Sequence, residues 1–357
     1  MRRKRVAFLP DNIATLPATT AGVINRLGLA DARALSISDN KYWTHNQHTK
    51  VLKTYKNRWK NPFLKLYYDS VKVFFIIKYI LWADYVYWVW DSALPFQLDL
   101  KLIKLLKKPL LVEWMGSDIR IPELIFRHNE FYKKAWQEDY PYKDESQEKS
   151  YRIQKKFAAA NAVPALSPEM MLYLLPGLFK QTFSVMQRID FSALPLAYPL
   201  PNKQKAVLVH TPSSHSAKGT KHIRETVSKL KETYELEYIE ITDVPREEVL
   251  KITATSDIFI DQIIFGNYGL AASEAMAMGK PVVCFLMDLM LEVLPQDCPI
   301  INASPKSLYN KLVPLLQNAK LRHEIGMKSR QYAEKYHDGE KIARQIIEIF
   351  SSLKKQK

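Results

Sequence analysis

The chain has 357 residues, of which 47% are apolar and 25% are charged, close to the average for soluble globular proteins. These values exclude a disordered chain, a collagen-like repeat and a disulfide scaffold, and the length predicts about two domains. Lys and Arg outnumber Asp and Glu by 52 to 37, and the net charge of +15 indicates an anionic partner.

The two halves of the chain differ in charge and in aromatic content. Residues 1–200 hold 30 Lys and Arg against 18 Asp and Glu, which gives +12 of the total +15, and all seven Trp lie between Trp43 and Trp136. The two cysteines, Cys284 and Cys298, are few for a secreted scaffold and lack metal-ligand spacing. We therefore expect a reducing compartment and a basic, aromatic first domain.

In the first half, short apolar runs alternate with amphipathic segments. Strands are predicted at 5–9, 34–37, 85–89, 110–114 and 162–165, and helices at 19–29, 67–82, 97–106 and 143–160. Short apolar strands between helices favour a parallel sheet that is covered on both faces. The long apolar stretch 71–90 is interrupted by Lys72, Lys78 and Asp84, so it indicates a helix and a strand rather than a membrane span.

The second half repeats the alternation after a proline-rich stretch at 194–205, which is the predicted linker. Strands are predicted at 206–210, 236–241, 257–261 and 281–286, and helices at 218–233, 245–254, 270–278, 305–317, 321–336 and 339–353. We expect two βαβ-rich domains, 1–200 and 201–338, with a ligand site in the cleft between them. A final helix within 339–357 is expected to return to the first domain.

The first chemical motif is the loop 211–220, with the sequence TPSSHSAKGT, between a predicted strand and a predicted helix. Such a junction can direct backbone N–H groups, hydroxyls and the Lys218 side chain towards a phosphate. The spacing of Gly219 and Lys218 is not that of a P-loop. A surface loop that happens to contain a lysine is the alternative interpretation.

The second motif is stronger and spans 261–283, with the sequence DQIIFGNYGLAASEAMAMGKPVV. A predicted strand ends at Asp261, a glycine-containing loop follows, and a helix of small residues begins near Gly269 and ends at Gly279. The start of that helix offers free amides to a diphosphate. Glu274, one turn later, could hold a ribose diol. The alternative is an exposed glutamate on a helix whose small residues only pack against the sheet.

Residues 274–283 (EAMAMGKPVV) resemble the most specific signature of the retaining glycosyltransferases of family 4. Lys218-Gly219-Thr220 resembles the diphosphate-binding lysine segment of that family, and 114–120 (WMGSDIR) resembles the strand-end loop of its acceptor domain. The resemblance is sharp over 206–286. It implies an α/β protein of the GT-B fold, in which two Rossmann-like domains face each other across a cleft.

The resemblance implies a glycosyltransferase that moves a sugar from a nucleotide-sugar donor to a glycan or lipid-linked acceptor, with retention of anomeric configuration. Lys218 would neutralise the donor β-phosphate, Glu274 would bind the ribose, and Asp118 is the second predicted catalytic residue. No metal and no cofactor are expected. The predicted donor-binding residues are Ser213, Lys218, Gly219, Asp261, Gln262, Asn267, Gly269, Leu270, Ala271 and Glu274.

Three positions depart from the family pattern. Family 4 usually carries a second glutamate eight positions before Glu274, where this chain has Gly266. An arginine is common where Ser213 stands, and a histidine is common where Met115 stands.

Other side chains could contact the donor sugar in place of the missing glutamate, either Asp261 with Gln262 or Asn267. Two other functions stay open because of the departures. One is a catalytically inactive, glycosyltransferase-like binding or scaffold protein, and the other is a sugar-nucleotide epimerase of similar fold.

The segment 41–79 bears on the acceptor, because it holds nine Lys and Arg against the single acid Asp69. Aromatic side chains are interleaved with the basic ones, namely Trp43, Tyr55, Trp59, Phe63, Tyr67 and Tyr68. This mixture suits an anionic membrane surface, and the alternative is a solvated loop. We expect a cytoplasmic protein on the inner face of the cell membrane that acts in cell-envelope polysaccharide synthesis. Nucleic acid is the rival anionic partner, but no nucleic-acid motif is present.

Overall fold

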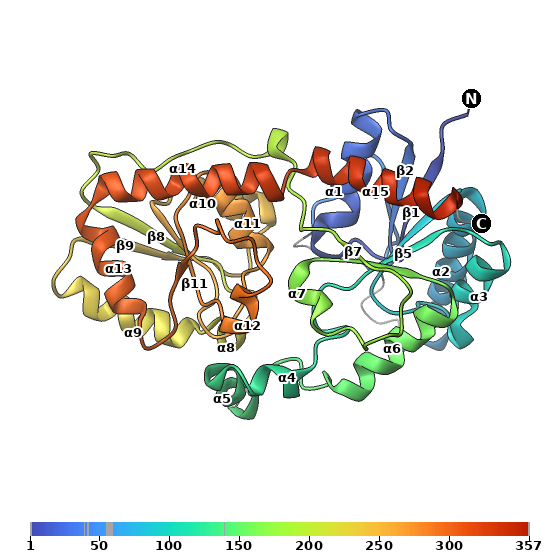
Figure 1. Ribbon diagram of the computed structural model, residues 1–357, viewed down its shortest axis with the longest axis horizontal. Coiled ribbons are helices and arrows are strands. Elements are labelled where there is room, and N and C mark those ends of the chain that lie inside the picture. The colour runs from blue at the N-terminus through green and yellow to red at the C-terminus, as the bar shows by residue number, and fades with distance from the viewer. Residues whose placement is uncertain (1, 39, 41–42, 55–59, 139, 356–357) are drawn as a thin grey trace. The chain divides into compact units, whose positions relative to one another are not determined.

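We describe the protein from a computed structural model, in which residues 2–38, 40, 43–54, 60–138 and 140–355 are described (Figure 1). The chain forms two compact units. The first comprises Met1–Arg120, Glu145–Arg188 and Gly339–Lys357, and the second comprises Ile121–Asp144 and Ile189–Asp338. Each unit is built on a parallel sheet with helices on both faces, so the predicted α/β fold with two parallel sheets is confirmed.

Among the described residues, the sheet of the first unit runs in the order β3-β2-β1-β4-β5-β6-β7. Its strands are β1 (Arg5–Leu9), β2 (Asp31–Ser36), β3 (Thr49–Val51), β4 (Tyr85–Val89), β5 (Leu110–Glu113), β6 (Val163–Leu166) and β7 (Phe183–Ser184). β1 lies between β2 and β4, where Val6 is in register with Ala32 and Tyr85. β4 is buried along its whole length, which explains its unbroken apolar sequence.

The helices of the first unit lie on both faces of this sheet (Figure 1). They are η1 (Ile13–Thr15), α1 (Leu16–Arg26), α2 (Pro62–Trp82), η2 (Pro95–Gln97), α3 (Leu98–Leu105), α6 (Gln147–Ala159), α7 (Pro168–Met171) and α15 (Gly339–Lys355). α1 and α15 share one hydrophobic core with β1, β2 and β4. The ring of Phe350 on α15 stacks on Tyr85 with centroids 4.8 Å apart, so α15 belongs to this core.

The sheet of the second unit runs in the order β12-β11-β10-β8-β9. Its strands are β8 (Ala206–His210), β9 (Leu236–Glu240), β10 (Ile258–Ile260), β11 (Val282–Cys284) and β12 (Ile301–Asn302). Its helices are α4 (Pro122–Phe126), α5 (Glu130–Glu138), η3 (Phe191–Ala193), α8 (His215–Lys218), α9 (Thr220–Lys231), α10 (Arg246–Thr255), α11 (Leu270–Ala277), α12 (Asp288–Leu291), α13 (Leu308–Gln317) and α14 (Ala319–Tyr336). α9 and α13 cover one face and α10, α11 and α14 the other (Figure 1).

Residues 121–144 belong by contact to the second unit, although they interrupt the first unit in sequence. The Asn129 side chain donates to the Ile264 carbonyl at 2.7 Å, and the rings of Tyr132 and Phe265 lie edge to face, 5.4 Å apart. A division of the chain at residue 200 therefore separates this segment from the residues on which it packs.

The proline-rich stretch at 194–205 also lies on the second unit. The amide of Ala197 donates to the Met278 carbonyl at 3.0 Å, and the His323 ring is bonded to the Pro199 carbonyl at 2.8 Å. Proline suits this stretch because it gives up an amide hydrogen that an extended surface segment does not use.

Candidate functional site

The lysine loop connects β8 to α9 through the short helix α8. Ser214 begins α8 by accepting the amide hydrogen of Ala217, and Gly219 ends it with φ +77°. A Cβ atom at Gly219 would lie 2.8 Å from side-chain atoms of both Ile263 and Ile264. Glycine is therefore required here both by the left-handed backbone and by the close approach of the next loop. This turn directs the Lys218 side chain towards the carboxyl end of β10.

Asp261, directly after β10, joins Lys218 to the start of α11. Its Oδ1 lies 2.5 Å from Lys218 Nζ, and its Oδ2 accepts the amide hydrogen of Gly269 at 2.9 Å. Asp261 is buried, with 1% of its surface exposed. The structure thus brings together three predicted donor-binding residues, and the carboxylate occupies the position between the cation and the helix N-terminus.

Glu274 is buried in α11 and faces Arg246 at the start of α10. The Arg246 Nε donates to Glu274 Oε1 at 3.0 Å, and its Nη2 bonds the same oxygen. Burial raises the pKa of Glu274, and the Arg246 guanidinium opposes that shift. Sequence reasoning missed Arg246, since the only signal was a basic residue in the first turn of a predicted helix.

The loop between β10 and α11 holds the remaining predicted donor contacts. The Gln262 side-chain amide donates to the Asn267 carbonyl. The Asn267 side-chain Oδ1 is buried and has no hydrogen-bond partner among the described residues. Leu270 and Ala271 form the first turn of α11, where their amides have no intrahelical acceptor.

Gly266 stands where the family usually has a glutamate, and the space beside it is filled. Its φ is +88°, and a Cβ there would lie 2.9 Å from Asn129 Nδ2 and 3.1 Å from Met287 Cγ. Asn129 is itself fixed, since its amide holds the Ile264 carbonyl and its Oδ1 accepts the Tyr132 amide hydrogen at 3.0 Å. Asn129 could not be predicted as a neighbour of Gly266, because 137 positions separate the two residues in the chain.

We predict that Gly266→Glu lowers the free energy of unfolding by about 1–3 kcal/mol. The glutamate would have to adopt the left-handed backbone of this position, and its Cβ would clash with the Asn129 side chain. It should not raise donor affinity. Urea denaturation and donor titration of the variant measure both quantities. A stable variant with tighter donor binding would contradict this reading of the loop.

Ser213 lies exposed in the loop before α8, and its side chain has no hydrogen bond among the described residues.

The carboxylate of Glu240, at the end of β9, is held by Arg224 at 2.6 Å and lies 3.3 Å from the ring of His215 in α8. The hydrogen bond from Arg224 lowers the pKa of Glu240 to about 2, so this carboxylate is ionised at any working pH.

His210 ends β8 beneath the lysine loop. Its Nδ1 lies 2.8 Å from the Ile260 carbonyl, which can only accept, so Nδ1 carries the proton and Nε2 accepts from the Thr220 hydroxyl at 2.9 Å. Burial lowers the pKa of His210 to about 4, against 6.5 for an unperturbed histidine. The neutral ring thus holds the start of α9 beside the loop.

This lowered pKa predicts that His210 costs the protein stability in acid. Between pH 6.5 and pH 4 the unfolded chain binds a proton at His210 that the folded protein excludes, so the contribution of His210 falls by about 3 kcal/mol as the pH falls, whereas the raised pKa of the buried Asp118 acts in the opposite direction below pH 6. Urea denaturation of the wild type and of His210→Gln at pH 7 and pH 4.5 isolates the His210 contribution as the difference between the two pH dependences. His222→Gln, on the outer side of α9, should keep the wild-type pH dependence.

In the first unit, the predicted acceptor loop follows β5. The Asp118 carboxylate accepts the amide hydrogens of Met115, Gly116 and Ile119 at 2.9–3.0 Å. Burial raises the pKa of Asp118 to about 6, although these hydrogen bonds oppose the shift. In this geometry Asp118 shapes the loop, and a catalytic role for it stays a prediction.

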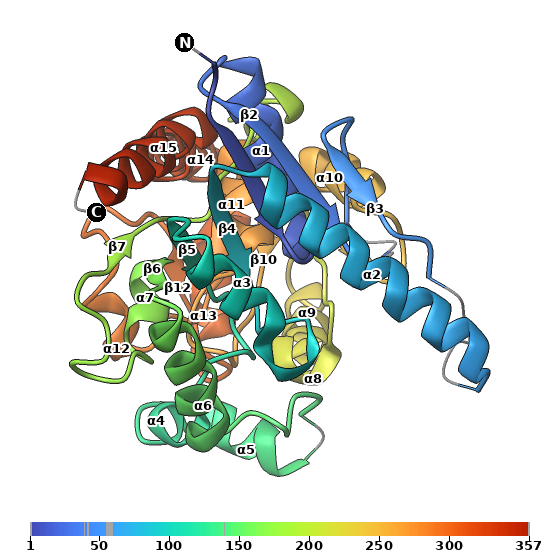
Figure 2. The ribbon, with the colours of Figure 1, turned by 90° about the vertical axis from the view of Figure 1, so that its right-hand side faces the viewer.

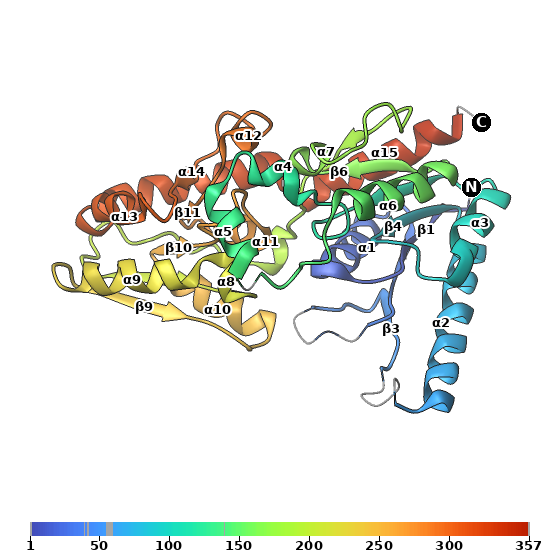
Figure 3. The same cartoon turned by 90° about the horizontal axis from the view of Figure 1, so that it is seen from below.

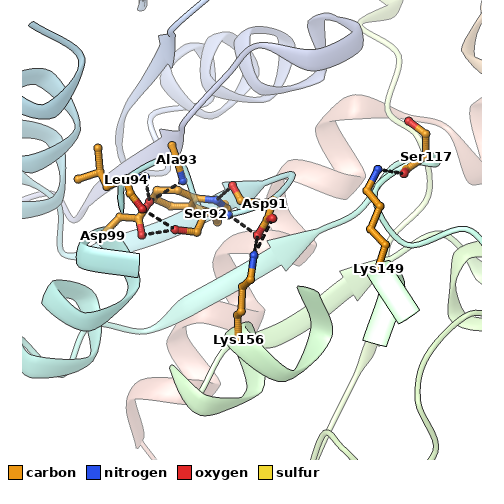
Figure 4. Close-up of polar contacts among 9 residues, drawn as sticks. Asp91, Ser92, Ala93, Leu94, Asp99, Ser117, Lys149 and Lys156 are labelled. Atoms are coloured by element: carbon orange, nitrogen blue, oxygen red, sulfur yellow. Dashed lines mark hydrogen bonds and ion pairs between the residues drawn. The ribbon is translucent and has the colours of Figure 1, made fainter. Parts of the chain in front are cut away.

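Two lysines of α6 reach the strand-end loops of the same edge (Figure 4). Lys156 pairs with Asp91, which follows β4, at 2.9 Å, and Lys149 donates to the Ser117 carbonyl in the acceptor loop at 3.2 Å. They are seven residues apart and therefore lie on one face of α6. The turn after β4 is itself braced by Asp99, which accepts from the Ser92 hydroxyl at 2.7 Å. Half-buried charges thus gather at the carboxyl edge of this sheet.

The outer face of α2 carries exposed apolar side chains along its length, with the exposed Ser70 and Lys78 among them. The exposed fractions are 81% for Phe63, 67% for Leu66, 57% for Tyr67, 58% for Phe74 and 54% for Leu81. These residues recur at helical spacing, and the N-terminal end of α2 stands away from the sheet (Figures 2 and 3). Part of this face falls within 41–79, of which residues 41–42 and 55–59 lie outside the described residues.

The surface continues onto η2 and α3, which pack beside the C-terminal half of α2 (Figure 2). Phe96 is 83% exposed and Leu105 is 78% exposed. The backbone of Phe96 is left-handed, with φ 54°, a strained conformation that holds its ring outward. Sequence periodicity missed this part of the surface. Among the described residues, helices that are both long and apolar enough to cross a membrane are absent.

No family model matches this chain. A curated relative, the trehalose synthase of Pyrococcus horikoshii, is 22% identical over 149 residues, which are 41% of this chain and 36% of that protein. The match thus spans about a third of the length of the relative.

Solved structures resemble the chain over its full length. A glycosyltransferase from Rickettsia africae superposes with a TM-score of 0.63 at 14% identity, covering 100% of both chains. HepE of Anabaena, in complex with UDP-glucose, gives a TM-score of 0.60 at 14% identity, covering 98% of this chain and 99% of HepE. These likenesses define the class of fold, which is the GT-B fold of glycosyltransferases.

The same fold occurs outside transferases. A Listeria monocytogenes protein with a proposed UDP-N-acetylglucosamine 2-epimerase activity gives a TM-score of 0.53 at 12% identity, covering 100% of this chain and 98% of that one. The fold alone therefore does not separate a transferase from an epimerase.

Proposed function

We propose that this protein is a glycosyltransferase that binds a nucleotide-sugar donor on its second unit. The observation that carries the proposal is the convergence of the Lys218 ammonium and the Gly269 amide on one buried anion at the carboxyl end of β10. A cation beside a helix N-terminus is the arrangement that holds a diphosphate. UDP-glucose, which is bound to the structurally similar HepE, makes a uridine diphosphate sugar the first donor to test.

In the proposed reaction, negative charge grows on the diphosphate as the glycosidic bond breaks. Lys218 and the amides of Gly269, Leu270 and Ala271 would stabilise this charge, and one preorganised donor of this kind contributes about 10²–10³ in rate. Positive charge is thus supplied by the protein, and we propose a reaction without metal and with retention of configuration. Groups of three metal-ligating side chains are absent from the described residues.

The nucleoside and the sugar would meet different side chains. A ribose hydroxyl would replace the Arg246 hydrogen bonds on Glu274, in the manner that the family resemblance implies. Asn267 is the best candidate for the sugar contact, because its buried Oδ1 has an unused acceptor site, whereas Gln262 is already bonded and both oxygens of Asp261 are engaged.

We propose that the first unit receives a lipid-linked or glycan acceptor at a membrane. At the sheet edge, the Lys149 ammonium on α6 would meet an anionic acceptor, whereas the Lys156 ammonium is already paired with Asp91. The exposed apolar side chains of α2 and α3 have exposed lysines beside them, including Lys78 and Lys101, and this face would lie against anionic lipid. A cytoplasmic location at the inner face of the cell membrane and a role in cell-envelope polysaccharide synthesis follow from this proposal.

The proposal is tested by a thermal-shift screen of nucleotide sugars followed by turnover assays. A bound donor raises the melting temperature by mass action. A transferase releases nucleoside diphosphate only when acceptor is present, and NMR of the product reports the anomeric configuration. Donor conversion without acceptor would indicate an epimerase. Donor binding without turnover in any acceptor screen would indicate an inactive binding protein.

We predict that the double change Phe63→Ser and Phe74→Ser weakens binding to vesicles that contain anionic lipid by at least about tenfold, because two exposed rings no longer enter the interface. Vesicle co-sedimentation at low and high salt measures the effect. Tyr142→Ser, which removes a 42% exposed ring from the second unit, is the matched control. Stronger binding to single-stranded oligonucleotides than to vesicles would contradict the membrane proposal.

A further inference from the structure

Asp261 holds the two groups that the proposed function assigns to the diphosphate. One carboxylate oxygen lies 2.5 Å from Lys218 Nζ, and the other accepts the Gly269 amide hydrogen at 2.9 Å. A phosphate at the start of α11 needs the same amide and the same ammonium. The Gly269 amide has a single hydrogen and cannot serve both anions, and a phosphate placed beside the Asp261 carboxylate at the Lys218 ammonium would be repelled by its like charge.

We propose that Asp261 is an internal counter-anion that occupies the diphosphate position while the site holds no donor, and that it yields Lys218 and the Gly269 amide when the donor binds. The inference rests on the proposed function, because it concerns the same two groups. It gives Asp261 a role in setting the affinity and the charge selectivity of the site, instead of a contact with the sugar.

Burial explains why the empty site needs such an anion. The Lys218 side chain is only 12% exposed and the Asp261 side chain 1% exposed. A charge buried to that degree without a partner is strongly destabilising. Asp261 is well placed to compensate Lys218, since it follows a strand whose three residues are all buried. The pair keeps the loop formed without a ligand and leaves no net charge at the bottom of the site.

The same neutral pair favours highly charged ligands. A small anion that displaces the carboxylate from Lys218 replaces one negative charge with another and gains little. A diphosphate carries more charge and more oxygens, and it can also bond the free amides of Leu270 and Ala271. We therefore expect the site to discriminate against orthophosphate and to release its product by return of the carboxylate.

The test compares the 357-residue wild-type chain with its Asp261→Asn variant by calorimetric titration with inorganic pyrophosphate and orthophosphate. Asp261→Asn should bind pyrophosphate at least tenfold more tightly than the wild type does. Its affinity for orthophosphate should rise by a larger factor, so that its preference for pyrophosphate over orthophosphate is smaller than that of the wild type. Its ligand-free melting temperature should fall, and pyrophosphate should restore it to the wild-type value or above. Weaker pyrophosphate binding by Asp261→Asn would overturn the inference, because the carboxylate would then position Lys218 for the ligand.

Asp257→Asn is the matched control. Asp257 precedes β10 at its other end and forms a similar pair with Lys203 at 2.6 Å. This variant should lose stability without a change in pyrophosphate affinity. If Asp261→Asn has no cooperative melt on its own, the appearance of one with pyrophosphate supports the inference and its absence contradicts it.

The outcomes separate this inference from the proposed function. Pyrophosphate binding needs neither sugar nor acceptor, so the expected behaviour of Asp261→Asn together with no transfer would remove only the glycosyltransferase proposal. Measured transfer together with weakened pyrophosphate binding by Asp261→Asn would remove only the inference. Absence of pyrophosphate binding by the wild type would contradict both.

Discussion

Lys218→Gln is expected to lower the rate of sugar transfer about hundredfold or more in a protein that still folds, with a lower melting temperature because the buried Asp261 loses its ionic partner. Glutamine still donates a hydrogen bond towards Asp261, but it removes the positive charge that would meet the leaving diphosphate. Loss of one preorganised charge-stabilising group costs about 2.7–4 kcal/mol in the transition state. The effect should therefore appear in kcat as well as in donor affinity.

The measurement is release of nucleoside diphosphate at saturating donor and acceptor, with the melting temperature as a check on folding. Lys221→Gln is the matched control, because Lys221 is exposed on α9 three residues later. It should keep wild-type rates. Wild-type turnover in a well-folded Lys218→Gln protein would show that the lysine loop is not where the donor diphosphate binds.

Much of the fold could be predicted from the sequence, because a strand that is covered on both faces of a parallel sheet is a short, continuous apolar run that stands out between amphipathic helices. The predicted ranges 5–9, 85–89 and 206–210 agree with β1, β4 and β8. β3 and β7 were missed, since strands of three and two residues are too short to carry a period. The assignment of 121–144 to the second unit was also out of reach, because its contacts with Ile264 and Phe265 join positions far apart in the chain.

The candidate site divides in the same way. The place of Lys218 and of the loop glycines at the carboxyl edge of the sheet could be predicted from the sequence, because a loop that joins a parallel strand to the next helix lies at that edge. The partners of the charged residues could not. Arg246 on Glu274 and Asp261 on Lys218 depend on side-chain directions across different elements. Two predicted ligand-binding charges are thus neutralised inside the protein, so a donor that binds as we propose would have to exchange partners with Asp261 and Arg246.

Gly269→Ala is expected to weaken UDP binding at least tenfold without destabilising the protein. The backbone of Gly269, with φ −105° and ψ −177°, is open to any residue, and a Cβ there would meet nothing closer than Asp261 Oδ2 at 3.7 Å and Lys218 Nζ at 3.9 Å. The methyl group would nevertheless stand directly beside the pair, where the diphosphate must approach the start of α11. The free energy of unfolding should stay the same or rise by about 0.4–1 kcal/mol, because alanine restricts the unfolded chain.

Calorimetric titration with UDP and urea denaturation measure the two quantities separately. Gly279→Ala provides the contrast, since Gly279 has φ +78° and a Cβ there would lie 2.5 Å from the Tyr198 ring, so that variant should lose stability. A Gly269→Ala protein that binds UDP as the wild type does would place the diphosphate away from the N-terminus of α11. Gly269→Ala thus tests the geometry of the site, and Lys218→Gln tests its charge. If both variants behave as expected, the diphosphate binds beside Lys218 and Gly269, where the Asp261 carboxylate lies in the structure.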